Sequence, residues 1–400
     1  MQSRSSKHGT LAVRLLLNRL LPACLLLLAA GCSAPPFDPA KWQEKEASPF
    51  VEVDKAYQPT VQALAFSPDG KYLASCHQYM GRPNVREEFL AAPPVVKIWQ
   101  MDGRNCVDWA MFHIESGLMG TDNTALCFTP DGKTLSVLTK NGLLFWDVEQ
   151  QSLRRSRTSE PIAMAHDAKT VAQEANRDGS QQPHSNGGDG ISIVDGETGE
   201  TSQLISPRHA QVCPWCFSPD GRRLLVECFA PSSKHEAWEI WDLPDGRRQC
   251  SVAADNAAKW PCGFSPDGRT LAMVTTANDA SKATLYDAAT GRQKATLWEN
   301  VENLRCLAFS PDGRWVAIGC GQTEGGKKAN AGALHGQLRL WDLKQGKEYA
   351  SLIDRSSWGI TALTFSPDGK TLATGDGDGN IRFWEITRLK NASDPQTPSR

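Results

Sequence analysis

Short stretches in which apolar residues alternate with small or polar ones recur along the chain, and tight turns separate them. Segments such as "LAF", "LTF" and "KTLAT" have the period of two that is expected of a β-strand. Many first strands end at Ser-Pro-Asp-Gly, where proline restricts φ and glycine tolerates positive φ, which suits a tight turn. A second strand, a connection of variable length, a third strand ending in an aromatic residue, a Gly-rich turn and a fourth strand follow. The pattern predicts an all-β chain built from four-stranded antiparallel units.

The same turn recurs at regular intervals. It begins, in its full form or a close variant, at six positions: Phe66, Phe128, Phe217, Phe264, Phe309 and Phe365. The gap between the second and third copies is about two units long. It contains "MAHDAKTVA" from Met164, which aligns with "FSPDGKTLA" in the last copy. The chain therefore contains seven repeated units.

The third strands of several units end in Trp-Asp, as at residues 146–147, 241–242 and 341–342. With four strands per unit, this pattern resembles the WD40 repeat family over about residues 50–387. The resemblance implies a seven-bladed β-propeller that binds other proteins and has no enzymatic activity of its own. The Gly-His pair that opens many repeats of that family is missing. Asp378 best matches the Asp of the family's Asp-His-Ser-Trp hydrogen-bond network.

The last unit ends at its third strand, so the ring needs a fourth strand from elsewhere. The segment "FVEVDKA", Phe50–Ala56, reads as a strand that pairs into the last blade and closes the ring. Residues 32–49 are then a tether, residues 50–387 the propeller, and residues 388–400 a disordered tail.

Residues 1–31 carry four basic residues, no acidic ones, and an apolar stretch that is too short to span a bilayer. This is the pattern of a signal peptide. The ending "LAAGC" resembles the bacterial lipobox, which implies lipid attachment at Cys32. The sequence thus predicts an exported protein, anchored by lipid in the bacterial cell envelope. A rival box at Cys24 and an ordinary cleaved secretory signal remain alternatives.

Composition and charge narrow the class of partner. The chain is 40% hydrophobic and 22% charged, as expected for a globular protein. Without residues 1–31 it has 39 basic and 45 acidic residues. A mildly acidic surface with no basic cluster argues against nucleic acid as a partner.

The sequence "VCPWCFSPDG" places Cys213 and Cys216 in a C-x-x-C, which is found in redox dithiols and metal sites. Cys216 aligns with small residues of the other units, which favours a packing role. In a regular strand, residues three apart point to opposite faces, about 10 Å apart, which is too far for a disulfide. We expect most of the cysteines after Cys32 to be buried free thiols.

Catalytic motifs are absent from the sequence, so no catalytic residues, cofactor or metal are predicted. Four histidines lie in the expected loops of one face, but in four different blades and without ligand spacing. They are His77, His184, His235 and His335.

The connections between second and third strands vary widely in length and share one face of the propeller. Those of blades one, three, four and six predict a recognition face. Residues of the types favoured at interfaces lie in or near them: Tyr79, Arg82, Arg86, Phe89, Trp260 and Trp358. The function hypothesis is a protein-interaction scaffold. The alternatives are a small-molecule or catalytic site at the channel mouth and a thiol-based redox protein.

Overall fold

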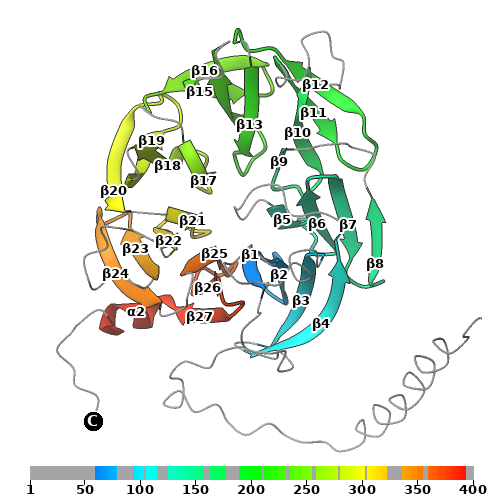
Figure 1. The fold of residues 1–400 in the computed structure, drawn as a ribbon, viewed down its shortest axis with the longest axis vertical. Coiled ribbons are helices and arrows are strands. Elements are labelled where there is room, and N and C mark those ends of the chain that lie inside the picture. Colours follow the sequence, from blue (N-terminus) through cyan, green and yellow to red (C-terminus); the bar gives the residue numbers. More distant parts are fainter. Residues whose placement is uncertain are drawn as a thin grey trace, which may run out of the picture. The chain divides into compact units, whose positions relative to one another are not determined.

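The computed structural model describes residues 59–78, 93–102, 105–114, 125–155, 162–175, 189–209, 211–230, 235–254, 258–277, 280–301, 304–321, 336–354 and 359–392. All of them belong to Glu46–Arg400, the second of two compact units of the chain. The described residues form seven antiparallel sheets, arranged as a β-propeller in a ring with the first strand of each blade innermost (Figure 1).

The first four blades each have four strands, paired in chain order. Blade one contains β1 Thr60–Phe66, β2 Tyr72–Gln78, β3 Val95–Asp102 and β4 Asn105–His113; blade two contains β5 Leu126–Phe128, β6 Thr134–Thr139, β7 Gly142–Asp147 and β8 Ser152–Arg155. Blade three contains β9 Ala163–Met164, β10 Thr170–Ala175, β11 Gly190–Asp195 and β12 Thr201–Ile205; blade four contains β13 Gln211–Phe217, β14 Arg223–Phe229, β15 His235–Asp242 and β16 Arg247–Val252.

Blades five and six follow the same plan, and blade seven has three strands among the described residues. Blade five contains β17 Ala258–Phe264, β18 Thr270–Ala277, β19 Ala280–Asp287 and β20 Gln293–Val301; blade six contains β21 Leu304–Phe309, β22 Trp315–Cys320, β23 Gly336–Asp342 and β24 Lys347–Asp354. Blade seven contains β25 Ile360–Phe365, β26 Thr371–Asp376 and β27 Ile381–Glu385. The prediction of seven blades, including the degenerate third one, is confirmed.

The hydrophobic core lies between neighbouring blades. Side chains of β14, for example, contact blade three through Val226 and Cys228 and blade five through Leu225. Both faces of each inner strand are therefore buried, and their sequences are almost continuously apolar or small. Burial of both faces explains why small residues recur where a two-sided sheet would have polar ones.

Blades seven and one close the ring. The Thr361 hydroxyl donates to the Val61 carbonyl oxygen at 2.6 Å, and the Thr60 hydroxyl donates to the Gly377 carbonyl oxygen at 3.1 Å. Gly375 has to be glycine, because a Cβ there would collide with the Val61 side chain. The predicted closing strand, Phe50–Ala56, lies outside the described residues.

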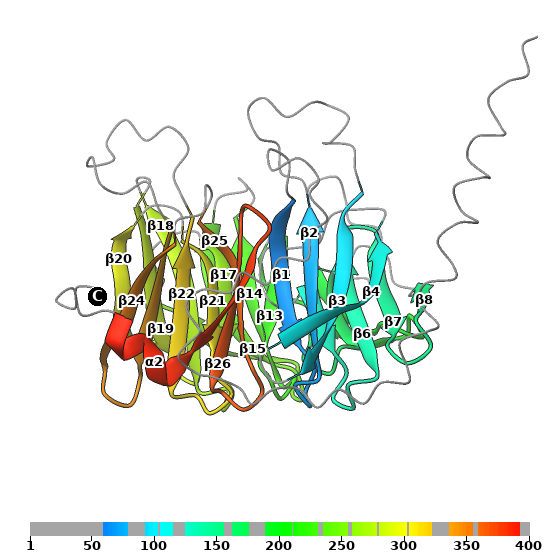
Figure 2. The same ribbon diagram turned by 90° about the horizontal axis from the view of Figure 1, so that it is seen from below.

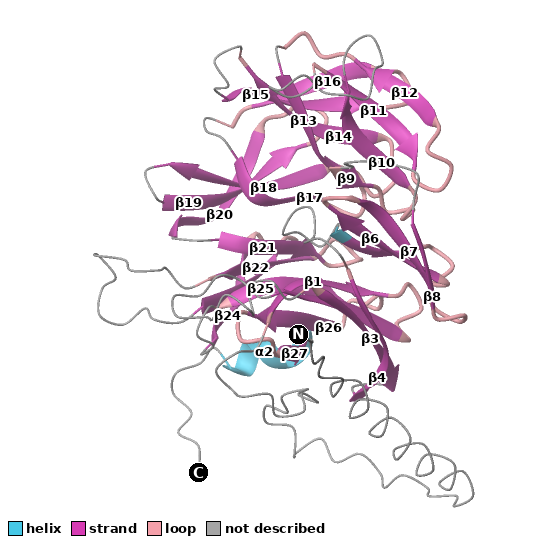
Figure 3. Cartoon of the chain, turned by 45° about the vertical axis from the view of Figure 1, so that its right-hand side comes forward, coloured by secondary structure: helices cyan, strands magenta, loops and turns pink. Residues whose placement is uncertain are grey.

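A short helix, α2 Ile386–Ala392, follows β27 and packs beside β24 and β27 (Figure 3). Its Ile386 and Leu389 side chains are buried in the core shared by blades six and seven. The expectation that residues 388–400 form a disordered tail is wrong for the described part, because Leu389 gains burial by adopting helical structure. Within the described residues, no helix combines the length and apolar composition that a membrane span needs.

The Ser-Pro-Asp-Gly turns hold themselves together by hydrogen bonds. In blade one the Ser67 hydroxyl donates to the Asp69 carboxylate at 2.6 Å and accepts from the Tyr72 amide at 2.9 Å. The same hydroxyl-to-carboxylate bond forms in five further blades, at Thr129–Asp131, Ser218–Asp220, Ser265–Asp267, Ser310–Asp312 and Ser366–Asp368. The turn sequence is therefore satisfied locally, which explains why it repeats.

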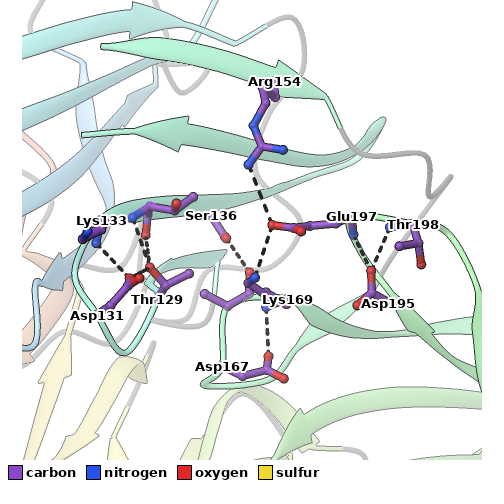
Figure 4. A network of polar contacts seen from close by, with 12 residues as sticks. Thr129, Asp131, Lys133, Ser136, Arg154, Asp167, Lys169, Asp195, Glu197 and Thr198 are labelled. Carbon is purple, nitrogen blue, oxygen red and sulfur yellow. Dashed lines mark hydrogen bonds and ion pairs between the residues drawn. The ribbon is translucent and has the colours of Figure 1, made fainter. Parts of the chain in front are cut away.

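Proline of this turn also contacts the next blade. A Cβ built on Gly132 would lie 3.8 Å from Pro68 Cδ, and one on Gly369 would lie 3.9 Å from Pro311 Cδ. The degenerate blade three has Ala168 at φ 60° in place of the glycine. The Ser136 hydroxyl of blade two donates to the Ala168 carbonyl oxygen and supports that turn (Figure 4).

Candidate functional site

The propeller has two unlike faces. The first strand of each blade runs toward the Ser-Pro-Asp-Gly turn, so these turns and the turns between third and fourth strands share one face, which we name the turn face. The connections between second and third strands, and those between blades, lie at the opposite face, which we name the loop face. Figure 2 shows the blades edge-on, with the strands running between these two faces.

Charged residues of the turn face pair within their own turns or with neighbouring ones. Hydrogen bonds from the Ser265 hydroxyl and the Arg269 amide lower the pKa of Asp267. Between blades two and three, Glu197 lies 3.4 Å from Lys169 Nζ and 3.7 Å from Arg154 Nη2 (Figure 4). These carboxylates hold turns and link neighbouring turns.

Most of the predicted recognition residues lie outside the described part of the chain: Tyr79, Arg82, Arg86, Phe89 and Trp358, together with the predicted lipid-attachment residue Cys32. Trp260 lies within β17, one residue after Lys259, which pairs with Val274 of β18. Its strand position agrees with the predicted place near a first strand. The recognition face therefore stays a prediction.

Two of the four histidines, His77 and His235, lie in strands and not in loops. His77 lies in β2, where it pairs with Val61 and Val95 and is 1% exposed. Its placement in the connection was wrong, because β2 extends to Gln78. Burial lowers the pKa of His77 to about 3, so the ring is neutral. His184 and His335 lie outside the described residues, and His235 begins β15.

The C-x-x-C in β13 is not bonded, and Cys213 and Cys216 are both free thiols. The argument that they point to opposite faces was wrong. The register of β13 shifts between Pro214 and Cys216, so the two cysteines pair with Glu227 and Leu225, which lie two residues apart on β14. A β-bulge adds one residue to the strand and restores a common face.

Cys216 contacts a different thiol. Its Sγ lies 3.4 Å from Sγ of Cys262 in blade five, and both residues are buried. The nine cysteines whose side chains the structure describes are free thiols, as predicted for most of them. Burial raises the pKa of Cys213, and the nearby carboxylates of Glu174 and Glu227 raise it further. A raised pKa disfavours the thiolate that redox chemistry requires.

Parts of the family's hydrogen-bond network are present in blades one and seven. Trp99 Nε1 donates to the Ser75 hydroxyl at 2.8 Å, and that hydroxyl lies 2.9 Å from His77 Nε2. In blade seven, Trp384 Nε1 donates to the Thr374 hydroxyl at 2.8 Å. In both blades a hydroxyl of the second strand accepts from the tryptophan of the third.

The Asp376 side chain organises the blade-seven turn. The Asp376 carboxylate accepts from the amides of Asp378 and Asn380 at 2.9 Å each, and from Arg382 Nη1 at 2.7 Å. Asp376 is 1% exposed, so burial and the Arg382 charge fix it in place. The match of Asp378 to the family's aspartate stays a prediction.

Blade four replaces the hydroxyl with a carboxylate. Val226 occupies the strand position of Ser75, and Trp241 Nε1 donates instead to Oε2 of Glu239 at 2.9 Å. Trp146 and Trp341, whose blades also have an apolar residue there, have no partner for Nε1 among the described residues. Glu239 is 2% exposed and is thus a buried charge that needs compensation.

Two basic side chains and a thiol surround this carboxylate. Glu239 Oε1 accepts from Arg248 Nη1 at 2.8 Å and lies 3.2 Å from His209 Nε2. The other ring nitrogen of His209 lies 3.0 Å from Glu236 Oε2. Cys228 is fully buried, and its Sγ lies within 4.8 Å of ligand atoms of both His209 and Glu239. We name His209, Cys228, Glu236, Glu239 and Arg248 the blade-four cluster.

Electrostatics in the cluster favour the charged forms of the acid and the bases. Burial by itself would raise the pKa of Glu239, but hydrogen bonds from Arg248, His209 and Trp241 outweigh it and lower the pKa. Burial would likewise lower the pKa of His209, but its bonds to Glu236 and Glu239 raise it. The cluster is therefore an ion-paired network with a carboxylate at its centre.

Sequence reasoning missed this cluster. A signal was present in "HEAWEIWD", where Glu239 stands two places before Trp241. The corresponding position in other blades is Lys97, Leu144 or Arg339. Its partners gave no signal, because His209, Cys228 and Arg248 come from three separate segments.

Large apolar side chains are exposed on the outer edge of blade one. Trp109 is 39% and Met111 is 59% exposed, both on β4. The Trp109 ring lies 5.9 Å from that of Tyr72. Tryptophan and methionine are enriched at protein interfaces.

Comparison with known families finds the WD domain, G-beta repeat, over residues 52–79, 291–342 and 346–385. One similar protein is the WD repeat-containing protein SL1-17 of Schistosoma mansoni, which is 26% identical over 39% of this chain and 46% of its own length. Small ribosomal subunit protein RACK1 of Drosophila melanogaster is 25% identical over 44% of this chain and 55% of its own length. Nuclear distribution protein PAC1 of Coccidioides posadasii is 24% identical over 42% of this chain and 36% of its own length.

The family matches fall in the first blade and in the last part of the ring, and they support the WD40 resemblance. Each aligned segment covers little more than half, or less, of the relative's length.

Proposed function

We propose that this protein is a non-enzymatic interaction scaffold of the bacterial cell envelope, which holds a protein partner on its loop face. The loops of blades one, three, four and six form the recognition surface. A lipid on Cys32 attaches the propeller to the membrane.

The unequal construction of the two faces carries this proposal. Every described Ser-Pro-Asp-Gly-type turn is short and satisfied by its own hydrogen bonds. On the loop face, β6 ends at Thr139 and β7 begins at Gly142, whereas β2 ends at Gln78 and β3 begins only at Val95. Similar long connections follow β10 and β22. Long insertions confined to one face of a rigid repeat scaffold usually serve binding.

The comparisons lend support of a general kind. By their names, one relative is a protein of the small ribosomal subunit and another is a nuclear distribution protein. A propeller that works as part of a larger assembly is the nearest parallel for this chain. The exposed Trp109 and Met111 on blade one offer a further apolar contact beside the loop face.

The test is a cross-linked affinity purification of the full-length protein from its native membrane, read by mass spectrometry. One variant has the connections 79–94 and 322–335 shortened. A matched control carries Lys71→Ala and Arg269→Ala, two exposed residues of the turn face. A stoichiometric partner lost only from the loop variant supports the proposal. The absence of any protein partner, or equal recovery from all three proteins, overturns it.

The anchor has its own test. The N-terminal peptide of the mature protein should have the mass of a peptide that begins at an acylated Cys32. Cys32→Ser should release the protein from the membrane fraction. A mature chain that begins elsewhere and carries no lipid contradicts the anchoring, whatever the fate of the loop experiment.

A further inference from the structure

We propose that the blade-four cluster is a binding site for one zinc-like divalent cation, held by His209 Nε2, Cys228 Sγ and the carboxylate of Glu239. This inference is independent of the proposed scaffold function. It concerns a site inside one blade and the contact of that blade with its neighbour.

The three ligand atoms already lie close together, all within 4.8 Å of one another. The distance from His209 Nε2 to Glu239 Oε1 is 3.2 Å. A tetrahedral zinc ion with bonds of about 2.0–2.1 Å to nitrogen and oxygen holds those two atoms about 3.3 Å apart. The pair therefore has the spacing of two zinc ligands, and Cys228 Sγ lies within 4.8 Å of both of their ligand atoms.

The ligand types select the metal. Thiolate and imidazole together are typical of zinc and related transition metals, whereas calcium and magnesium prefer oxygen ligands alone. With three protein ligands, a water molecule or a group from a bound partner supplies the fourth. Among the described residues, this is the group of three in which nitrogen, sulfur and oxygen ligands converge.

Groups around the ligands support them as an outer shell does in metal sites. Glu236 Oε2 lies 3.0 Å from Nδ1 of His209, which directs the other nitrogen toward Cys228 and Glu239. Arg248 and Trp241 each donate to Glu239 and fix its carboxylate. A carboxylate on the far side of a ligating histidine is a common feature of zinc sites.

An ion can reach the cluster from the loop face. His209 lies in the connection before β13 and its side chain is 15% exposed, while that of Glu236, at the start of β15, is 48% exposed. Cys228 and Glu239 lie beneath them and are buried. The site thus has a surface entrance and an enclosed inner side.

Zinc titration of the purified full-length protein, in competition with a chromophoric chelator, tests the proposal. We expect one tightly bound zinc per chain, lost in Cys228→Ser and in His209→Gln. Glu236→Gln should weaken binding about ten- to hundredfold, as outer-shell changes do. Cys76→Ser, which removes an equally buried free thiol from blade one, is the matched control and should bind as the unaltered protein does.

Cobalt provides a second measurement that needs no variant to fold. In the unaltered protein, Co²⁺ should give the near-ultraviolet charge-transfer band of a thiolate ligand and the visible bands of tetrahedral cobalt. Absence of zinc binding, a cobalt spectrum without the thiolate band, or undiminished binding in a folded Cys228→Ser protein would each overturn the proposal.

Discussion

Glu227 is a buried acid whose ionisation should weaken the fold at neutral pH. It lies in β14, is 5% exposed, and packs on the side of blade four that faces blade five. Burial raises the pKa of Glu227 from 4.5 to about 7, and its hydrogen bond with Trp215 lowers the pKa by a smaller amount.

The sign of the effect follows from the direction of this shift. A carboxyl with a higher pKa in the folded protein binds more protons there than in the unfolded chain, so stability falls as pH rises from about 4.5 to about 7. Each unit of pKa difference corresponds to about 1.36 kcal/mol, which makes the full cost about 3 kcal/mol above pH 7. Between pH 5 and pH 8 the loss is about 2.5 kcal/mol.

Glu227→Gln keeps the shape of the side chain and removes its charge, so it should remove this loss. Urea unfolding at pH 5 and pH 8, followed by tryptophan fluorescence, measures it. The difference in free energy of unfolding between the variant and the unaltered protein should shift by about 2.5 kcal/mol in favour of the variant from pH 5 to pH 8. Glu200→Gln, at an exposed glutamate, is the control and should leave the pH dependence as it was. If Glu227→Gln and the unaltered protein lose stability in parallel, the account of a buried, protonated Glu227 is refuted.

Three further predictions concern the stability of the propeller. Gly291→Ala places a Cβ against the Ser251 carbonyl at φ +70°, whereas Gly221→Ala, at φ +68°, has no atom within 4 Å and so reports the backbone strain alone. In thermal unfolding, Gly221→Ala should lower the free energy of unfolding by about 1–2 kcal/mol, and Gly291→Ala should lower it clearly more. Val137→Thr offers Trp146 Nε1 the hydroxyl that its blade lacks, whereas at Val226→Thr the nearby Trp241 already donates to Glu239. Val137→Thr should therefore lower the free energy of unfolding by about 1 kcal/mol less than Val226→Thr does. Equal losses would contradict the inference that Val137 and Val226 occupy the position of Ser75. Fully buried thiols should react with a thiol reagent only after denaturation, and rapid reaction of all of them in the native protein would contradict the described packing.

Local sequence determined the repeated architecture, because each unit carries its own instructions. The hydroxyl, carboxylate and glycine of the Ser-Pro-Asp-Gly turn satisfy one another within six residues, as at Ser67, Asp69 and Tyr72. Period-two strands on either side of such a turn can form only a hairpin. Even the degenerate third copy could be recognised, since its Asp167 still binds the amide of Lys169.

Where prediction from sequence was wrong, a nonlocal contact decided the outcome. His77 is part of β2 because Val61 and Val95 pair with it on both sides. Helix α2 exists because Leu389 finds a buried place against blade six, which its short sequence does not reveal. The bulge after Pro214 brings two cysteines to one face that a regular strand would keep apart.

Candidate chemistry depends on tertiary structure most of all. The sequence by itself determined seven blades, their turns and the face with the long connections. Only the folded ring brings His209, Cys228, Glu239 and Arg248 together, from four segments that no spacing rule connects. The physical reason is that a buried carboxylate must find its partners in space, and those partners come from whichever strands and connections the packing of the blades places beside it.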